Sequence, residues 1–170
     1  PLVELPVQSY NFCGCAPSPA AAAAADWSAS CDGSSLLLAL PNVDAQLVLL
    51  WDLRQRTEAL SFTESSDLVT DLAFVDGKAP TLVASSADGC LCTFDLRRGA
   101  LGAMSDNQED ELLSLAPMKN GTKLVVGTES GVLGIFSWGD WGDVSDRLLG
   151  HPQSVDAVVP INDDVLLSAS

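Results

Sequence analysis

An internal repeat with a period close to 43 residues is the feature that most limits what this chain can fold into. Three short segments, VTDLAFV, LLSLAPM and VDAVVPI, begin at residues 69, 112 and 155, and each alternates apolar with polar or small residues. A second register recurs at nearly the same interval, because Trp51, Phe94 and Phe136 lie 43 and 42 residues apart. Alternation with a period of two indicates half-buried strands, so the chain is predicted to consist of repeated groups of strands.

Each complete copy of the repeat has the same order of strands and turns. An apolar strand, TLVASS or KLVVGT, is followed by a tight turn, ADG or ESG, and then by a further strand, CLCTFDL or VLGIFSW. Asp88-Gly89 is a hairpin signal because glycine tolerates the positive φ of a two-residue turn, and Gly131 takes the same place one repeat later. The segment EDELLSLA, at 109–116, has helical propensity, but its register in the repeat predicts a strand.

A meander of four short strands that recurs every 40 to 45 residues is typical of the blades of a β-propeller. We therefore predict an all-β fold, an incomplete propeller with about three to four blades of four-stranded antiparallel meanders. The predicted blades cover 27–68, 69–111, 112–154 and, truncated, 155–170. Because such a ring is stable only when it closes, we expect the working unit to be longer than this chain.

The first 35 residues do not follow the repeat. They include six consecutive alanines with prolines around them, as in a low-complexity linker. We predict that 1–35 is an irregular Ala/Pro-rich segment or a degenerate blade start, and that the blades occupy 36–170. The chain begins at Pro1 and stops within a strand-like pattern at Ser170, so we expect it to be a segment of a longer protein.

Charge and cysteine content exclude several classes of ligand. Eight basic against 23 acidic side chains give a formal charge of −15, which repels phosphate backbones, so we expect no direct nucleic-acid binding. The longest apolar runs are far shorter than the roughly 20 residues of a membrane helix, so no membrane contact is expected. Cys13 with Cys15 and Cys90 with Cys92 form two Cys-x-Cys pairs. We interpret them as buried thiols in a reducing compartment rather than zinc ligands, and we predict no metal and no cofactor.

Several segments resemble a known class of repeat. LVLLWDLR, at 47–54, and GCLCTFDLR, at 89–97, look like closing strands of WD repeats, and Gly150-His151 precedes Val155 as the repeat-opening Gly-His does. From about residue 47 onward the chain resembles the WD repeat-containing protein 55 family in particular. The resemblance rests on SADGCLCTFDLRRG, on EDELLSLAPMKNGTKLVVGTESGVLGIFSWGDWGDVSDR and on PQSVDAVVPINDDVLLSAS, which match the central blades of that family in order and spacing.

The resemblance implies structural roles for several repeat positions. In WD repeats a histidine placed like His151 bonds within its own blade, to a hydroxyl on the second strand and to an aspartate in the following turn. Ser168 or Ser170 can supply the hydroxyl here. No copy in this chain carries the complete polar set, so we expect apolar packing to hold the blades. The structural repeat residues are His151, Asp88, Gly89, Gly131, Phe94 and Phe136.

No catalytic constellation is predicted. His151 is the only histidine in the chain, and its repeat position favours a structural role, so we expect a protein that is not an enzyme. A hydrolase or a metalloenzyme would need residues outside this segment. The acidic segments are SDNQEDE, at 105–111, and the loop that contains Asp140, Asp143 and Asp146. They lack the ligand spacing of a calcium loop, and we interpret them as solvated loop charge.

The candidate partner-binding residues lie where the predicted closing strands end. In WD-repeat substrate receptors of cullin-RING ubiquitin ligases, a WDxR sequence is associated with docking on the adaptor, and its arginine supplies a bidentate contact. Trp51, Asp52 and Arg54 match that pattern, and Asp95 and Arg97 keep the spacing in a second copy. In the structural alternative, the tryptophan packs between blades, the aspartate ties the strand end to a turn, and the arginine is solvated.

Trp138 and Trp141 are a further pair of partner-binding candidates. Exposed aromatic residues often dominate the binding energy of protein interfaces, and core packing against the next blade is an equal alternative for this pair.

Two functions follow from the resemblance. The family is nuclear and nucleolar and supports ribosomal RNA production, which implies a protein–protein interaction scaffold in ribosome biogenesis. The implied location is the nucleus and nucleolus, with the cytoplasm as a further compartment. The acidity of the chain favours basic ribosome-assembly factors as partners. The alternative is a substrate receptor for a cullin-RING E3 ubiquitin ligase that docks on the ligase adaptor through the WDxR motifs.

Overall fold

The computed structural model describes residues 16–17, 37–41, 46–52, 57–75 and 81–170, and none of these residues is helical. This part of the chain therefore holds no helix that could cross a membrane. The strands are β1 (Ala16–Pro17), β2 (Leu37–Pro41), β3 (Val48–Asp52), β4 (Thr57–Phe62), β5 (Val69–Val75), β6 (Thr81–Ser86), β7 (Leu91–Asp95), β8 (Ala100–Met104), β9 (Leu112–Met118), β10 (Lys123–Thr128), β11 (Val132–Ser137), β12 (Asp146–Leu149), β13 (Ala157–Pro160) and β14 (Leu166–Ala169).

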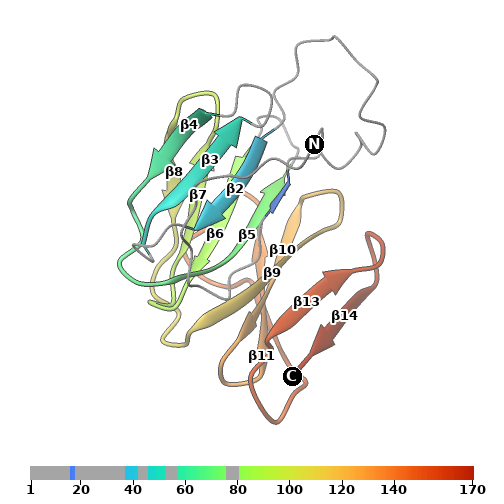
Figure 1. Cartoon of the computed structure of the whole chain (residues 1–170). Coiled ribbons are helices and arrows are strands. Elements are labelled where there is room, and N and C mark those ends of the chain that lie inside the picture. The colour runs from blue at the N-terminus through green and yellow to red at the C-terminus, as the bar shows by residue number, and fades with distance from the viewer. Residues whose placement is uncertain (1–15, 18–36, 42–45, 53–56, 76–80) are drawn as a thin grey trace, which may run out of the picture.

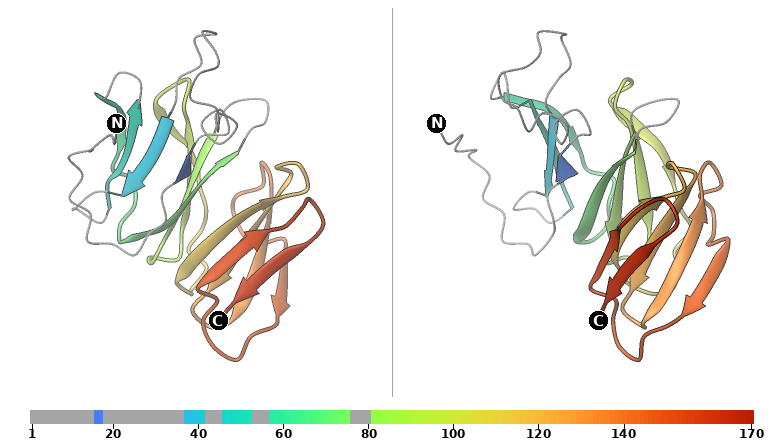
Figure 2. Two further views of the ribbon diagram at one scale, coloured as in Figure 1. Left: turned by 45° about the vertical axis from the view of Figure 1, so that its right-hand side comes forward. Right: turned by 90° about the vertical axis from the view of Figure 1, so that its right-hand side faces the viewer.

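The strands form three four-stranded sheets and a final hairpin. In chain order the sheets are β1–β4, β5–β8 and β9–β12, and β13 pairs with β14. Within each sheet, strands that follow one another in the chain pair antiparallel, which makes each four-stranded sheet a meander. Figure 1 and the right-hand view of Figure 2 show the sheets one after another. The predicted all-β fold, an incomplete propeller of four-stranded meanders, is confirmed.

The strands follow the register of the sequence repeat. β5 begins at Val69 and β9 at Leu112, so EDELLSLA contributes a strand rather than a helix. Within the segment 1–35 the structure describes only Ala16–Pro17, which pairs with β2. The first sheet thus includes residues upstream of the start predicted at residue 27. The bounds of the first blade stay a prediction, because the rest of that segment lies outside the described residues.

Glycines at the tight turns allow the hairpins to close. Gly89 has a φ of 82° and Gly131 a φ of 87°, in the left-handed region that side chains other than glycine rarely adopt. The N–H of Gly89 donates to the carbonyl of Ser86 at 3.1 Å, and the N–H of Cys90 donates to Oδ1 of Asp88 at 2.9 Å. The turn between β6 and β7 is therefore fixed by its own backbone and by one carboxylate.

Three apolar clusters fill the spaces between consecutive sheets. The first joins the first two sheets, and in it the rings of Phe62 and Phe94 stack with their centroids 4.3 Å apart. The second joins the second and third sheets around Phe136, which is fully buried. The third joins the third sheet to the last hairpin through Val155 and Val158. Phe94 and Phe136, which hold the same place in the repeat, are thus both buried between sheets.

The expected apolar packing holds the sheets together, and side-chain hydrogen bonds, which the sequence did not predict, join them as well. The N–H of Leu115, on β9, donates to Oδ2 of Asp71, on β5, at 2.8 Å. One repeat later the hydroxyl of Ser114 donates to the carbonyl of Val155 at 3.0 Å. Asp71 and Ser114 are 43 residues apart, so one repeat position ties each of these sheets to the next.

Connecting loops are also tied to hairpin turns by hydrogen bonds in two sheets, and the two ties have opposite polarity. In the second sheet the acid lies in the turn, and Oδ2 of Asp88 accepts the N–H of Ser66 at 3.0 Å. In the third sheet the acid lies in the loop, and Asp110 accepts hydrogen bonds from the N–H and the hydroxyl of Ser130. Asp88 and Ser130 hold the same place in their turns. The tie is thus present in both sheets, although the acid and its donor exchange sides.

Candidate functional site

The first WDxR copy is buried as far as the structure describes it. Trp51 and Asp52 are the last residues of β3, with 9% and 7% of their surfaces exposed. Arg54 lies outside the described residues. The burial of Trp51 matches the structural alternative, in which the tryptophan packs inside the protein. Docking through this copy stays a prediction.

The second copy places its acid and its arginine differently. The carboxylate of Asp95 accepts the N–H of Arg97 at 2.9 Å and that of Arg98 at 3.2 Å, so it caps the turn that follows β7. Arg97 itself is exposed. Asp95 therefore has a structural use in this turn, and Arg97 is accessible to a partner. The role of this pair in adaptor binding also stays a prediction.

Trp138 and Trp141 lie against the core and are partly exposed. Their rings meet edge to face, with centroids 4.8 Å apart and planes at 76°. Both are half-buried and pack against the cluster between the second and third sheets. The pair thus combines the two predicted environments, and its use as a partner-binding anchor stays a prediction.

His151 is engaged by a hydroxyl of its own repeat. Its Nε2 lies 2.8 Å from Oγ of Ser168, one of the two hydroxyls expected to meet it. Ser168 lies on β14, the second strand of the last hairpin. The pair joins the loop that opens the repeat to this strand, which is the geometry that the WD-repeat resemblance implies.

The described cysteines, Cys90 and Cys92, are shielded thiols. Cys92 is 1% exposed within the first cluster, and burial raises its pKa to about 11. Burial, with Asp88 and Asp106 nearby, also raises the pKa of Cys90. Among the described residues no group of three or more His, Cys, Asp or Glu side chains is arranged to hold a metal ion.

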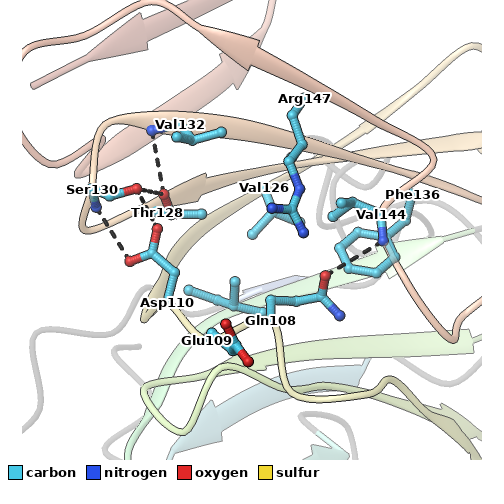
Figure 3. Close-up of a pocket in the computed structure, with 12 residues that line it drawn as sticks. Gln108, Glu109, Asp110, Val126, Thr128, Ser130, Val132, Phe136, Val144 and Arg147 are labelled. Atoms are coloured by element: carbon cyan, nitrogen blue, oxygen red, sulfur yellow. Dashed lines mark hydrogen bonds between the residues drawn. The ribbon is translucent and has the colours of Figure 1, made fainter.

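The structure contains a cavity that the sequence did not predict. It has a volume of about 300 Å³ and lies on the face of the third sheet that is turned toward the second sheet (Figure 3). Leu112, Val126 and Phe136 are fully buried apolar members of its wall, and half-buried Val144 adds to them. The remaining residues that line it are Gln108, Glu109, Asp110, Thr128, Ser130, Val132, Gly134 and Arg147.

The connection between β8 and β9 forms one side of this cavity. The N–H of Val144 donates to Oε1 of Gln108 at 3.4 Å, and Asp110 is bonded to Ser130 on the opposite side. Figure 3 shows the Arg147 side chain reaching over Val126, with Glu109 across the cavity from it. Arg147 forms an ion pair with Asp143 at 3.6 Å. The cavity thus has an apolar wall and a charged rim.

A second cavity of about 260 Å³ shares a wall with the first. Glu109 and Asp110 line both cavities. The second is otherwise lined by Ala87, Asp88, Asn107, Glu111 and Glu129. Its lining therefore contains five carboxylates and no basic residue. Three acids of the segment 105–111, which was predicted to carry solvated loop charge, therefore lie beside Asp88 and Glu129 of two hairpin turns. In the sequence these two turn residues are more than 15 residues from the segment, one on each side.

Known proteins that resemble this chain carry WD repeats. The chain is 40% identical over 125 residues to the WD repeat-containing protein JIP5 of Coprinopsis cinerea, a match that covers 72% of this chain and 30% of that protein. It is 38% identical over 126 residues to WD repeat-containing protein 55 of Arabidopsis thaliana, covering 74% of this chain and 35% of that protein. With the Rattus norvegicus protein of that name it shares 32% identity over 142 residues, or 81% of this chain and 37% of that protein. The chain thus spans about a third of the length of these relatives.

The structural comparison agrees on the fold. A chain in the crystal structure of a mitotic checkpoint complex matches with a TM-score of 0.65 and 21% identity, over 81% of this chain and 41% of that chain. No protein-family model matches the chain. The consecutive meanders, their packing and the curated relatives together define a WD-repeat β-propeller chain. Within that class, the chain is a relative of WD repeat-containing protein 55 and JIP5, which confirms the resemblance seen in the sequence.

Proposed function

We propose that the protein is a non-catalytic scaffold that binds other proteins during ribosome biogenesis and supports the processing of ribosomal RNA. The observation that carries the scaffold role is the WD-repeat propeller fold, in which stacked sheets hold exposed loops in fixed positions. The ribosomal role rests on the resemblance to the WD repeat-containing protein 55 family. Neither the scaffold role nor the ribosomal role requires a catalytic site.

The charge of the chain supports basic partners. With a formal charge of −15, this segment attracts basic ribosome-assembly proteins and repels RNA. We place the protein in the nucleus and nucleolus, with the cytoplasm as a further compartment. Its binding to such partners would weaken at high salt, because exposed charges are screened.

The test is depletion of the full-length protein from cells, followed by measurement of ribosomal RNA precursors by blotting. We expect precursors to accumulate and re-expression of the wild-type protein to restore their processing. A parallel affinity pull-down, with bound proteins identified by mass spectrometry, should recover ribosome-assembly factors. Unchanged precursors after complete depletion would refute the ribosomal role and leave a scaffold with another task.

The same pull-down separates this role from the ubiquitin-ligase alternative. The Arg54→Ala, Arg97→Ala double variant removes both WDxR arginines, and Arg97 is exposed, so its loss should leave the fold intact. We expect this variant to recover the same assembly factors as wild type. Recovery of a ligase adaptor by wild type but not by the double variant would favour the substrate-receptor function instead.

A further inference from the structure

We propose that the two adjoining cavities on either side of Glu109 bind a short extended segment of a basic partner protein, in which an apolar residue neighbours a lysine or arginine. The apolar side chain occupies the first cavity and the cation the second. This site deepens the proposed scaffold function by giving the chemistry of a partner. It rests on protein binding and not on the ribosomal role.

The first cavity suits an apolar side chain. Leu112, Val126 and Phe136 present buried apolar surface to it, and Gly134 leaves space beside Val144. A Cβ added at Gly134 would lie 3.0 Å from Cγ1 of Val144, so a side chain there would crowd this part of the cavity wall. A volume of about 300 Å³ is at the lower end of the range for ligand pockets, and an aliphatic side chain fits within it.

The second cavity suits a cation. Among the described residues, the carboxylates of Glu109, Glu111 and Glu129 have no hydrogen-bond or ion-pair partner, whereas Asp88 and Asp110 are bonded to neighbouring N–H groups. Three carboxylates that lack partners, in a concave site without a basic residue, set up a negative potential that a cationic side chain neutralises.

A single segment can reach both cavities because they share Glu109 and Asp110. Neighbouring residues of an extended chain lie about 3.3 Å apart along it and point to opposite sides, and residues two apart share a side. Asp110 is fixed to the hairpin turn by Ser130, so the partition between the cavities is held in place. The position of Arg147 on the rim of the first cavity disfavours a cation there and assigns the cation to the second.

The experiment uses the full-length protein and fluorescently labelled peptides with Gly-Ser flanks, measured by fluorescence anisotropy. The probe peptide contains Leu-Lys-Arg at its centre. In one control peptide the leucine is replaced by serine, and in another the two basic residues are replaced by glutamate. We expect the probe to bind at least about tenfold more tightly than either control.

Two protein variants test the cation site. Glu109→Gln, Glu111→Gln and Glu129→Gln together remove three negative charges from the second cavity. The control variant carries Glu58→Gln, Asp140→Asn and Asp156→Asn, three exposed acids that line neither cavity, so its net charge is the same. The first variant should bind the probe about tenfold more weakly than wild type, and the control variant should match wild type.

A third variant, Gly134→Ala, tests the apolar cavity. It should weaken binding of the leucine peptide and leave the weak binding of the serine peptide unchanged. Equal affinity of wild type for the probe and the serine peptide, or equal weakening by the two charge variants, would overturn the site. These outcomes concern peptide binding by the purified protein, so they are independent of whether depletion alters ribosomal RNA processing.

Discussion

Replacing Asp71 by alanine should loosen the contact between the second and third sheets. Asp71 lies on β5, and its Oδ2 accepts the N–H of Leu115 on β9 at 2.8 Å. Its Oδ1 accepts the N–H of Leu72 at 2.8 Å. Leu115 is buried, so its N–H cannot turn to water when the carboxylate is removed without a rearrangement of β9.

Two opposing effects set the size of the change. A buried N–H left without a partner costs about 1–3 kcal/mol. This loss of stability is partly offset, because the substitution also removes a buried carboxylate that is unfavourable to keep ionised. Burial raises the pKa of Asp71 above its ordinary value of 3.8, and the two N–H bonds lower it by less. We expect Asp71→Ala to reduce the free energy of unfolding by about 1–2 kcal/mol at neutral pH.

The pH dependence has a defined sign. Because the folded-state pKa of Asp71 is raised, the folded protein holds this proton more tightly than the unfolded chain does. The stability from this group is therefore complete below the ordinary pKa of 3.8 and is lost as the pH rises through the folded-state pKa. The Asp71→Asn variant cannot ionise at this position, so its stability does not fall with rising pH for this reason. Its stability deficit relative to wild type should shrink as the pH is raised above that ordinary value.

Urea unfolding of the full-length protein, followed by tryptophan fluorescence at several pH values, measures both quantities. Ser114→Ala is the matched comparison, since Ser114 holds the same repeat position and bonds Val155 through a neutral hydroxyl. It should cost about 1 kcal/mol at every pH. A deficit of Asp71→Asn that grows with rising pH, or an Asp71→Ala variant as stable as wild type, would refute the reasoning.

Three further outcomes are expected. Phe136→Ala should reduce the free energy of unfolding by about 3–5 kcal/mol in urea titrations, because it leaves a void in the cluster between the second and third sheets. Gly131→Ala should destabilise more than Gly139→Ala in the same titrations. Both glycines have positive φ, but an added Cβ at Gly131 lies 2.6 Å from the carbonyl oxygen of Gln153, whereas at Gly139 nothing lies within 4 Å. Cys92, whose pKa of about 11 leaves roughly one thiol in a thousand ionised at pH 8, should resist iodoacetamide until the protein is unfolded in urea, as peptide mass spectrometry can show.

The sequence predicted the sheets because their signals are local or periodic. Alternation, the Asp-Gly turn and the recurrence of an aromatic residue at Phe94 and Phe136 each depend on a few neighbouring residues or on one fixed interval. The polar ties between sheets were missed, although a periodic signal was present. Asp71 and Ser114 are polar residues at the same position of the repeated strand. Asp71 bonds Leu115 on β9, and Ser114 bonds Val155, two residues before β13 begins.

The cavities could not be predicted, because they depend on how a loop crosses between sheets. Glu109 has a φ of 59°, and its N–H donates to Oδ1 of Asn107 at 2.7 Å. That local turn places Glu109 beside acids of hairpin turns on both sides of it in the sequence. The order of charged residues along the segment 105–111 does not show which distant acids lie beside it. From the sequence alone, the segment is therefore interpreted as solvated loop charge.

The connection between β8 and β9 joins the two sheets and also carries the proposed docking site. The N–H of Leu91 donates to Oγ of Ser105 at 2.9 Å, and Nδ2 of Asn107 donates to the carbonyl of Asp88 at 2.6 Å. Together with the bond between Asp110 and Ser130, these contacts hold the connection to both sheets. The backbone of Glu109, which lies between Asn107 and Asp110, is thereby held in a fixed position. Because less conformational freedom is lost when a fixed segment binds, the same charges should attract a basic peptide more strongly here than on a free loop.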